Sequence, residues 1–122
     1  MDLPFHKIGI AHLACSLIFQ KHQVNEVLDL ISDDVYHRLF FEIAKKGTGV
    51  ELNADDVKLE GKAPARNEAV LRMFRIAKEE GCKFYLGSDA HHPSSLDRAP
   101  AIFRAFIDEL NLTEADKFHP FR

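Results

Sequence analysis

The chain lacks the features that mark secreted, membrane-spanning and nucleic-acid-binding proteins. Its 122 residues include only two cysteines, Cys15 and Cys82, and both lie in apolar surroundings. We expect two buried free thiols, as is usual in a reducing cytoplasm. No apolar run approaches the ~20 residues that a transmembrane helix needs. Residues 1–4 lack the basic-then-apolar order of a signal peptide. A net charge of -3 argues against a nucleic-acid partner, which would call for a basic surface. The sequence therefore predicts a cytoplasmic protein without membrane or nucleic-acid contacts.

What the chain does contain is an alternation of short apolar runs with helical patterns. With 46% hydrophobic and 29% charged residues, it has the composition of one soluble domain with a modest core. Strands are predicted at 7–13, 49–53 and 83–86. Helices are predicted at 24–31, 35–46, 67–80 and 96–110, with Pro100 in the first turn of the last one. This order indicates parallel strands joined by right-handed crossovers, and therefore an α/β fold.

The helical patterns also predict which side chains are buried. The second helix has an apolar side formed by Val35, Leu39 and Ile43, with Phe40 and Phe41 beside it. The third helix has the clearest apolar stripe, which consists of Val70, Leu71, Phe74 and Ala77. Three parallel strands make an unfinished sheet, so we expect its open edges to be covered by a second copy of the chain or by another partner.

The segment 87–93, Gly-Ser-Asp-Ala-His-His-Pro, stands between the third strand and the last helix. In parallel α/β folds this point is the carboxyl end of a strand, where ligands bind. Asp89 and His91 are two residues apart, so extended backbone would point both to one side. A carboxylate and a neutral imidazole on one side suit a divalent cation such as zinc, manganese or iron.

Other candidates for the site lie at the ends of the first and second strands. His12 would occupy the carboxyl end of the first strand, a position like that of Asp89. Glu51 and Asn53 would share one side of the second strand near its carboxyl end. That side either faces an active-site mouth or is an ordinary exposed polar face. Arg66 and His92 could each meet a substrate phosphate or lie on the surface.

Three segments resemble the PHP (polymerase and histidinol phosphatase) family. Residues 84–93, Phe-Tyr-Leu-Gly-Ser-Asp-Ala-His-His-Pro, resemble the last motif of that family. Residues 49–53 resemble the preceding strand, and 9–12 resemble the third metal motif. The resemblance implies a distorted (β/α)7 barrel with a two- or three-metal centre that hydrolyses phosphate esters. It also implies that His12, Asp89 and His91 are metal ligands, and that the substrate is a small-molecule phosphate ester.

The chain departs from the family pattern in its first half. The first motif of the family is a His-x-His pair, which does not occur here, and Glu51 stands on the wrong strand to replace the glutamate of the second motif. We therefore expect residues 1–122 to form a single partial domain, the C-terminal half of the barrel, with one metal subsite. Two alternatives remain open. The chain could be a non-catalytic remnant or assembly subunit, or a metal hydrolase of the amidohydrolase kind.

Overall fold

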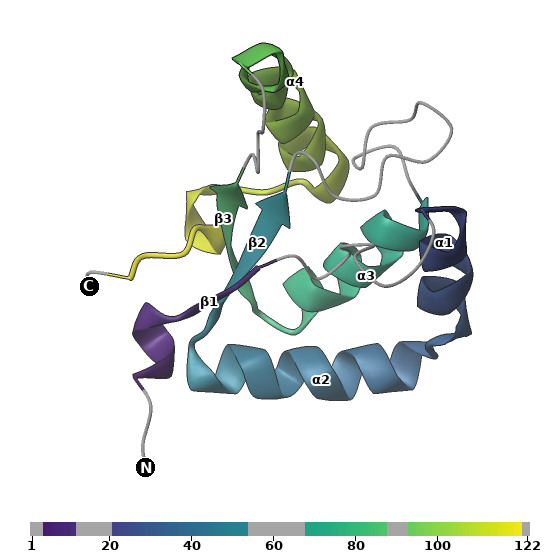
Figure 1. Ribbon diagram of the computed structural model, residues 1–122. Coiled ribbons are helices and arrows are strands. Elements are labelled where there is room, and N and C mark those ends of the chain that lie inside the picture. The colour runs from purple at the N-terminus through teal and green to yellow at the C-terminus, as the bar shows by residue number, and fades with distance from the viewer. Residues whose placement is uncertain (1–3, 12–20, 54–67, 88–92, 121–122) are drawn as a thin grey trace.

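The computed structural model describes residues 4–11, 21–53, 68–87 and 93–120 (Figure 1). Three strands, β1 (Gly9–Ile10), β2 (Gly49–Asn53) and β3 (Lys83–Gly87), form one parallel sheet in the order β1-β2-β3. The helices are α1 (Lys21–Leu30), α2 (Asp33–Lys46), α3 (Glu68–Glu79) and α4 (Pro93–Leu110). Short 3-10 helices η1 and η3 span Phe5–Lys7 and Glu114–Asp116. The predicted α/β alternation and the parallel sheet are confirmed.

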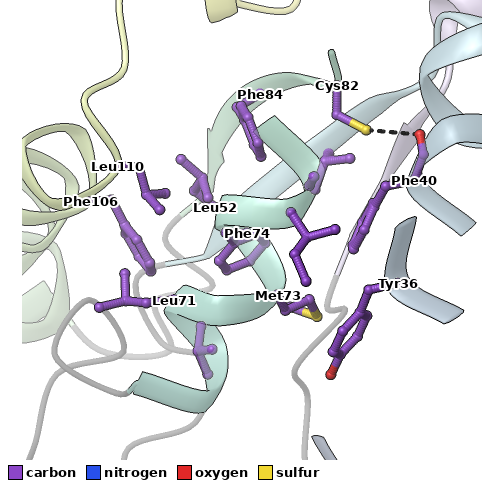
Figure 2. Packing of buried hydrophobic residues seen from close by; sticks show 14 of the residues in the cluster. Tyr36, Phe40, Leu52, Leu71, Met73, Phe74, Cys82, Phe84, Phe106 and Leu110 are labelled. Atoms are coloured by element: carbon purple, nitrogen blue, oxygen red, sulfur yellow. Dashed lines mark hydrogen bonds between the residues drawn. The ribbon is translucent and has the colours of Figure 1, made fainter. Parts of the chain in front are cut away.

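The core lies between the sheet and the helices. Val50, Leu52 and Phe84 are buried on the helix side of the sheet. The ring of Phe74 in α3 meets Phe84 edge-on at a centroid distance of 6.3 Å, and it meets Phe106 of α4 edge-on at 5.8 Å (Figure 2). The stripe predicted for α3 is therefore confirmed, because this helix occupies the centre of the core.

The buried face of α2 differs from the prediction. The helix begins as expected, with the Ser32 side chain accepting a hydrogen bond from the backbone of Val35. Ile43 and Phe40 are buried, but the third buried residue is Tyr36, whereas Val35, Leu39 and Phe41 are 43%, 48% and 53% exposed.

The reason for this difference is the large apolar area of the Tyr36 ring. Stacking on Phe40 at 6.2 Å buries that area, and the Tyr36 hydroxyl remains satisfied because it donates to the carbonyl of Leu28 at 2.9 Å.

Two predicted element boundaries are also wrong. Lys7 belongs to the 3-10 helix η1, so the first strand is shorter than predicted and is preceded by another element. Helix α4 begins at Pro93, which leaves Pro100 inside the helix instead of in its first turn. Pro93 is favourable at the first position of α4, because the φ angle of proline is already helical and its missing N–H costs no hydrogen bond there.

The outer edge of β3 is covered in part by the chain itself. The backbone N–H of Phe118 donates to the carbonyl of Phe84 at 2.8 Å, and Lys117 forms a parallel bridge with Phe84. The Lys83 ammonium donates to the carbonyl of Ala115 at 2.7 Å. At this edge, part of the cover that was expected from a partner therefore comes from the segment after α4. Among the described helices, none is both long and apolar enough to cross a membrane.

Candidate functional site

All three strands run in the same direction, so their carboxyl ends point toward one edge of the sheet. Strands β2 and β3 end level with each other at Asn53 and Gly87, whereas β1 ends opposite Val50. In the sequence, His12 comes two residues after the end of β1, and Asp89 and His91 come two and four residues after the end of β3. These three predicted metal ligands lie outside the described residues, as do Arg66 and His92. Of the residues considered for the site, Asn53 and its neighbour Glu51 are described.

The described ranges contain no group of three or more histidine, cysteine, aspartate or glutamate side chains that could hold a metal ion. The acidic and polar groups that are described at the carboxyl edge belong to β2. They lie on the inner face of the sheet, which we define as the face opposite the helices.

Asn53 is the last residue of β2 and is only 1% exposed. Its amide Nδ2 donates to Oε1 of Glu51 at 2.8 Å. The two side chains share a face, as the period of two in a strand predicts. The interpretation of this side as an ordinary exposed polar face is wrong for Asn53, because this residue is buried. Its buried amide donor is satisfied by the carboxylate of Glu51.

Glu51 is more closely integrated into this edge than its place in the sequence indicates. Its neighbour across the sheet is Tyr85, but its carboxylate extends toward the strand end and lies over Gly87. A Cβ atom at position 87 would overlap this carboxylate, so the glycine provides the space that Glu51 occupies. The sequence contains a signal for this arrangement, since Gly87 ends the neighbouring strand and Glu51 stands two residues before Asn53.

The amino-terminal half of the inner face is aromatic. The ring of Tyr85 extends over the backbone of Gly9 in β1, and the ring of Phe118 lies 5.9 Å from it between centroids. Burial raises the pKa of the Tyr85 hydroxyl, and the negative charge of Glu51 raises this pKa further. Tyr85 is therefore a neutral hydrogen-bonding group at physiological pH. Tyr85 lies between the aromatic amino-terminal half of the inner face and its polar carboxyl-terminal half.

Two hollows adjoin these aromatic side chains. One has a volume of about 390 Å³ on the inner face and is lined by Lys7, Gly9, Tyr85, Phe118 and Pro120. The larger one, of about 550 Å³, lies beside β3 between helix α4 and the segment after it, where Leu86, Arg104, Ile107 and Leu112 are among the lining residues. Apolar groups make up most of both linings, and neither lining includes Glu51 or Asn53.

Comparison with models of protein families, with curated proteins and with solved structures gave no match for this chain.

Proposed function

We propose that this chain carries one metal site of a PHP-type phosphoesterase and acts on a small-molecule phosphate ester. In this proposal its three strands correspond to the C-terminal half of a distorted (β/α)7 barrel. The ligands are His12 after β1, and Asp89 and His91 after β3, and they hold a divalent zinc, manganese or iron ion. A bound ion of this kind would act as a Lewis acid toward the phosphate and lower the pKa of a bound water.

The observation that carries the proposal is the parallel arrangement of β1 and β3 on either side of β2. The two segments that contain the proposed ligands follow strands that run in the same direction, toward the carboxyl edge of the sheet. Two strand spacings of about 4.8 Å separate β1 from β3, so side chains that reach inward from both could meet above β2. At the carboxyl end of β2 on the inner face, Glu51 and Asn53 contribute a carboxylate and an amide, and Gly87 leaves the room that the carboxylate occupies. The proposed donor set, two imidazoles and a carboxylate, fits a divalent cation.

The metal content of the purified protein tests the proposal. After dialysis, elemental mass spectrometry should find about one zinc, manganese or iron ion per chain. The Asp89→Ala variant should retain none, because it removes the charged ligand. The matched control is Asp108→Ala, which changes an exposed carboxylate in α4 and should leave the metal content unchanged. Hydrolysis of a simple aryl phosphate with added metal then tests the reaction. Metal that is retained equally by all three proteins would refute the ligand assignment.

A second candidate function is that of a non-catalytic assembly subunit. The observation that favours it is the exposure of Val35, Leu39 and Phe41 on α2, three large apolar side chains on one helix. The outer edge of β1 has no strand beside it within the described part of the chain, which also suits a second copy as partner. Light scattering coupled to size exclusion measures the molar mass. A monomer of 13.9 kDa at all concentrations would remove this candidate.

A further inference from the structure

The smaller of the two hollows, on the inner face of the sheet, is held in shape by the fold. Its described lining consists of Lys7, Gly9, Tyr85, Phe118 and Pro120. The Phe118 ring is fixed there, because it packs over Gly49 and because its backbone N–H donates to the carbonyl of Phe84. The volume of about 390 Å³ lies within the range of about 300–1,000 Å³ that is usual for sites that bind small molecules.

The walls of this hollow are formed mainly by ring side chains. The rings of Tyr85 and Phe118 lie 5.9 Å apart between centroids with an angle of 45° between their planes, and Pro120 adds a saturated ring. The hydroxyl end of Tyr85 lies over Gly9, where a Cβ atom would overlap it. Aromatic rings pack favourably against such walls in offset or edge-on geometry. The walls therefore favour a ligand with an aromatic body.

The hollow also contains two polar groups that no described residue engages. Lys7 is exposed, and within the described ranges its ammonium has no ion-pair or hydrogen-bond partner. The same is true of the Tyr85 hydroxyl, whose pKa is raised by burial and by the charge of Glu51, so that it remains a donor at physiological pH. Gly9, over which this hydroxyl lies, follows Lys7 by two residues, and covalent geometry limits the distance between their Cα atoms to about 7 Å. The two donors therefore belong to neighbouring parts of one hollow.

We propose that this hollow binds an aromatic carboxylate, with the ring of the ligand against Tyr85 and Phe118 and its carboxylate at the Lys7 ammonium and the Tyr85 hydroxyl. Among the described residues of the lining, Lys7 alone is charged. Its charge attracts an anion and disfavours the organic cations that aromatic faces otherwise bind. The inference goes beyond the proposed phosphoesterase activity and does not depend on it, because it uses only described residues of the inner face.

The larger hollow beside β3 does not have this preference for an anion. Its lining includes the acidic residues Glu114 and Asp116 as well as the basic residues Arg104 and Lys117. Opposite charges at one hollow partly cancel each other, so an aromatic carboxylate should bind there less well. Arg104 is 75% exposed, and its substitution therefore provides a control that removes one positive charge outside the proposed site.

The test is the dissociation constant of 2-naphthoate, a fluorescent aromatic carboxylate, measured by fluorescence anisotropy. Lys7→Met removes the charge at similar side-chain length and should weaken binding about two- to fivefold, as expected for an ion pair at an exposed position. Lys7→Arg keeps the charge and should bind like the parent protein. Tyr85→Phe keeps the ring but removes the hydroxyl, and it should also weaken binding. Arg104→Met is the matched control and should bind like the parent.

A second ligand separates the effect of charge from that of the ring. Naphthamide has the same ring without the charge, so it should bind the parent more weakly than 2-naphthoate and should be insensitive to Lys7→Met. Added salt should weaken binding of 2-naphthoate more than binding of naphthamide, because salt screens an ion pair at the surface. The melting temperature of each variant, followed by circular dichroism, distinguishes a folding defect from a binding defect.

Each outcome decides the proposal. Saturable binding of 2-naphthoate that weakens in Lys7→Met but not in Arg104→Met supports it. No saturable binding by the parent overturns it, as does an equal dissociation constant for the parent and Lys7→Met. A loss confined to Arg104→Met also overturns it, because the probe then occupies the larger hollow. Unchanged affinity in Tyr85→Phe overturns the role of the hydroxyl. The metal content of the protein is measured separately, so failure of this proposal is distinguishable from failure of the proposed function.

Discussion

The ring of Phe118 lies directly over the backbone of Gly49 on the inner face of the sheet. A Cβ atom built at Gly49 would overlap the ring, and Gly49 itself is buried by it. Phe118 belongs to the segment that follows α4, yet it covers a residue of the central strand. Together with the hydrogen bond from Phe118 to Phe84, this contact fixes the segment against the sheet.

The first prediction follows from this contact. Gly49→Ala should destabilise the fold by about 1–3 kcal/mol, because the Phe118 ring must move away from its packed position. Gly87→Ala is the comparison, since the atoms nearest to its Cβ belong to the end of the Glu51 side chain, which can rotate, and it should cost less than about 1 kcal/mol. Urea unfolding of both variants measures the difference. Equal losses would show that the Phe118 ring adapts without cost.

The second prediction concerns the centre of the core. Phe74 is 1% exposed and contacts both Phe84 and Phe106, so Phe74→Ala should cost about 3–5 kcal/mol through lost apolar burial and a residual cavity. Phe41→Ala makes the same change at a side chain that is 53% exposed, and it should alter stability by no more than about 0.5 kcal/mol. The free energy of unfolding in urea measures both. A large loss for Phe41→Ala would indicate that this side chain is buried in an assembly.

The third prediction concerns the start of α2. The Ser32 hydroxyl accepts a hydrogen bond from the backbone N–H of Val35 at 3.3 Å, so Ser32→Ala should lower the free energy of unfolding by about 1 kcal/mol. Ser32→Asn retains an acceptor and should recover most of the loss. Thermal and urea unfolding of the two variants provide the comparison, and equal stabilities would mean that the cap contributes nothing.

The fourth prediction concerns pH. Burial raises the pKa of the Cys82 thiol to about 11, the charge of Glu80 adds to the shift, and the thiol donates to the carbonyl of Phe40. In the unfolded chain this thiol ionises near 9.0. Between about pH 9 and 11 the unfolded state therefore loses a proton that the folded state keeps. The stability contributed by the neutral thiol is complete below pH 9 and disappears as the pH rises through 11.

The measurement uses Cys82→Ala as the reference, in a Cys15→Ser background. Urea unfolding at several pH values should show a decline between pH 9 and 11 that is steeper with Cys82 present, by about 1 kcal/mol per pH unit. Tyr36 and Tyr85 also have raised pKa values, and they contribute equally to both proteins. Parallel curves would show that Cys82 ionises no differently in the folded state.

The sequence by itself determined the order of elements, the parallel sheet and the buried stripe of α3. Hydrophobic periodicity and the spacing of strand-like runs are local properties, and they are strong in this chain. Local chemistry also determined both ends of α2, where Ser32 caps the first turn and Gly47 adopts a left-handed φ of 73°. For the site, the period of two in β2 was enough to place Glu51 and Asn53 on one face.

Only the tertiary structure decided which side chains of α2 are buried, how far the last helix extends, and what covers the edge of β3. The burial of Tyr36 and the cover of β3 depend on contacts between separate elements of the fold. The Tyr36 ring can be buried because the Leu28 carbonyl accepts the hydrogen bond of its hydroxyl. The Glu51 side chain extends over β3 because position 87 has no Cβ. No local pattern contains that information, since it arises when separate segments compete for the same space and the same hydrogen-bond partners.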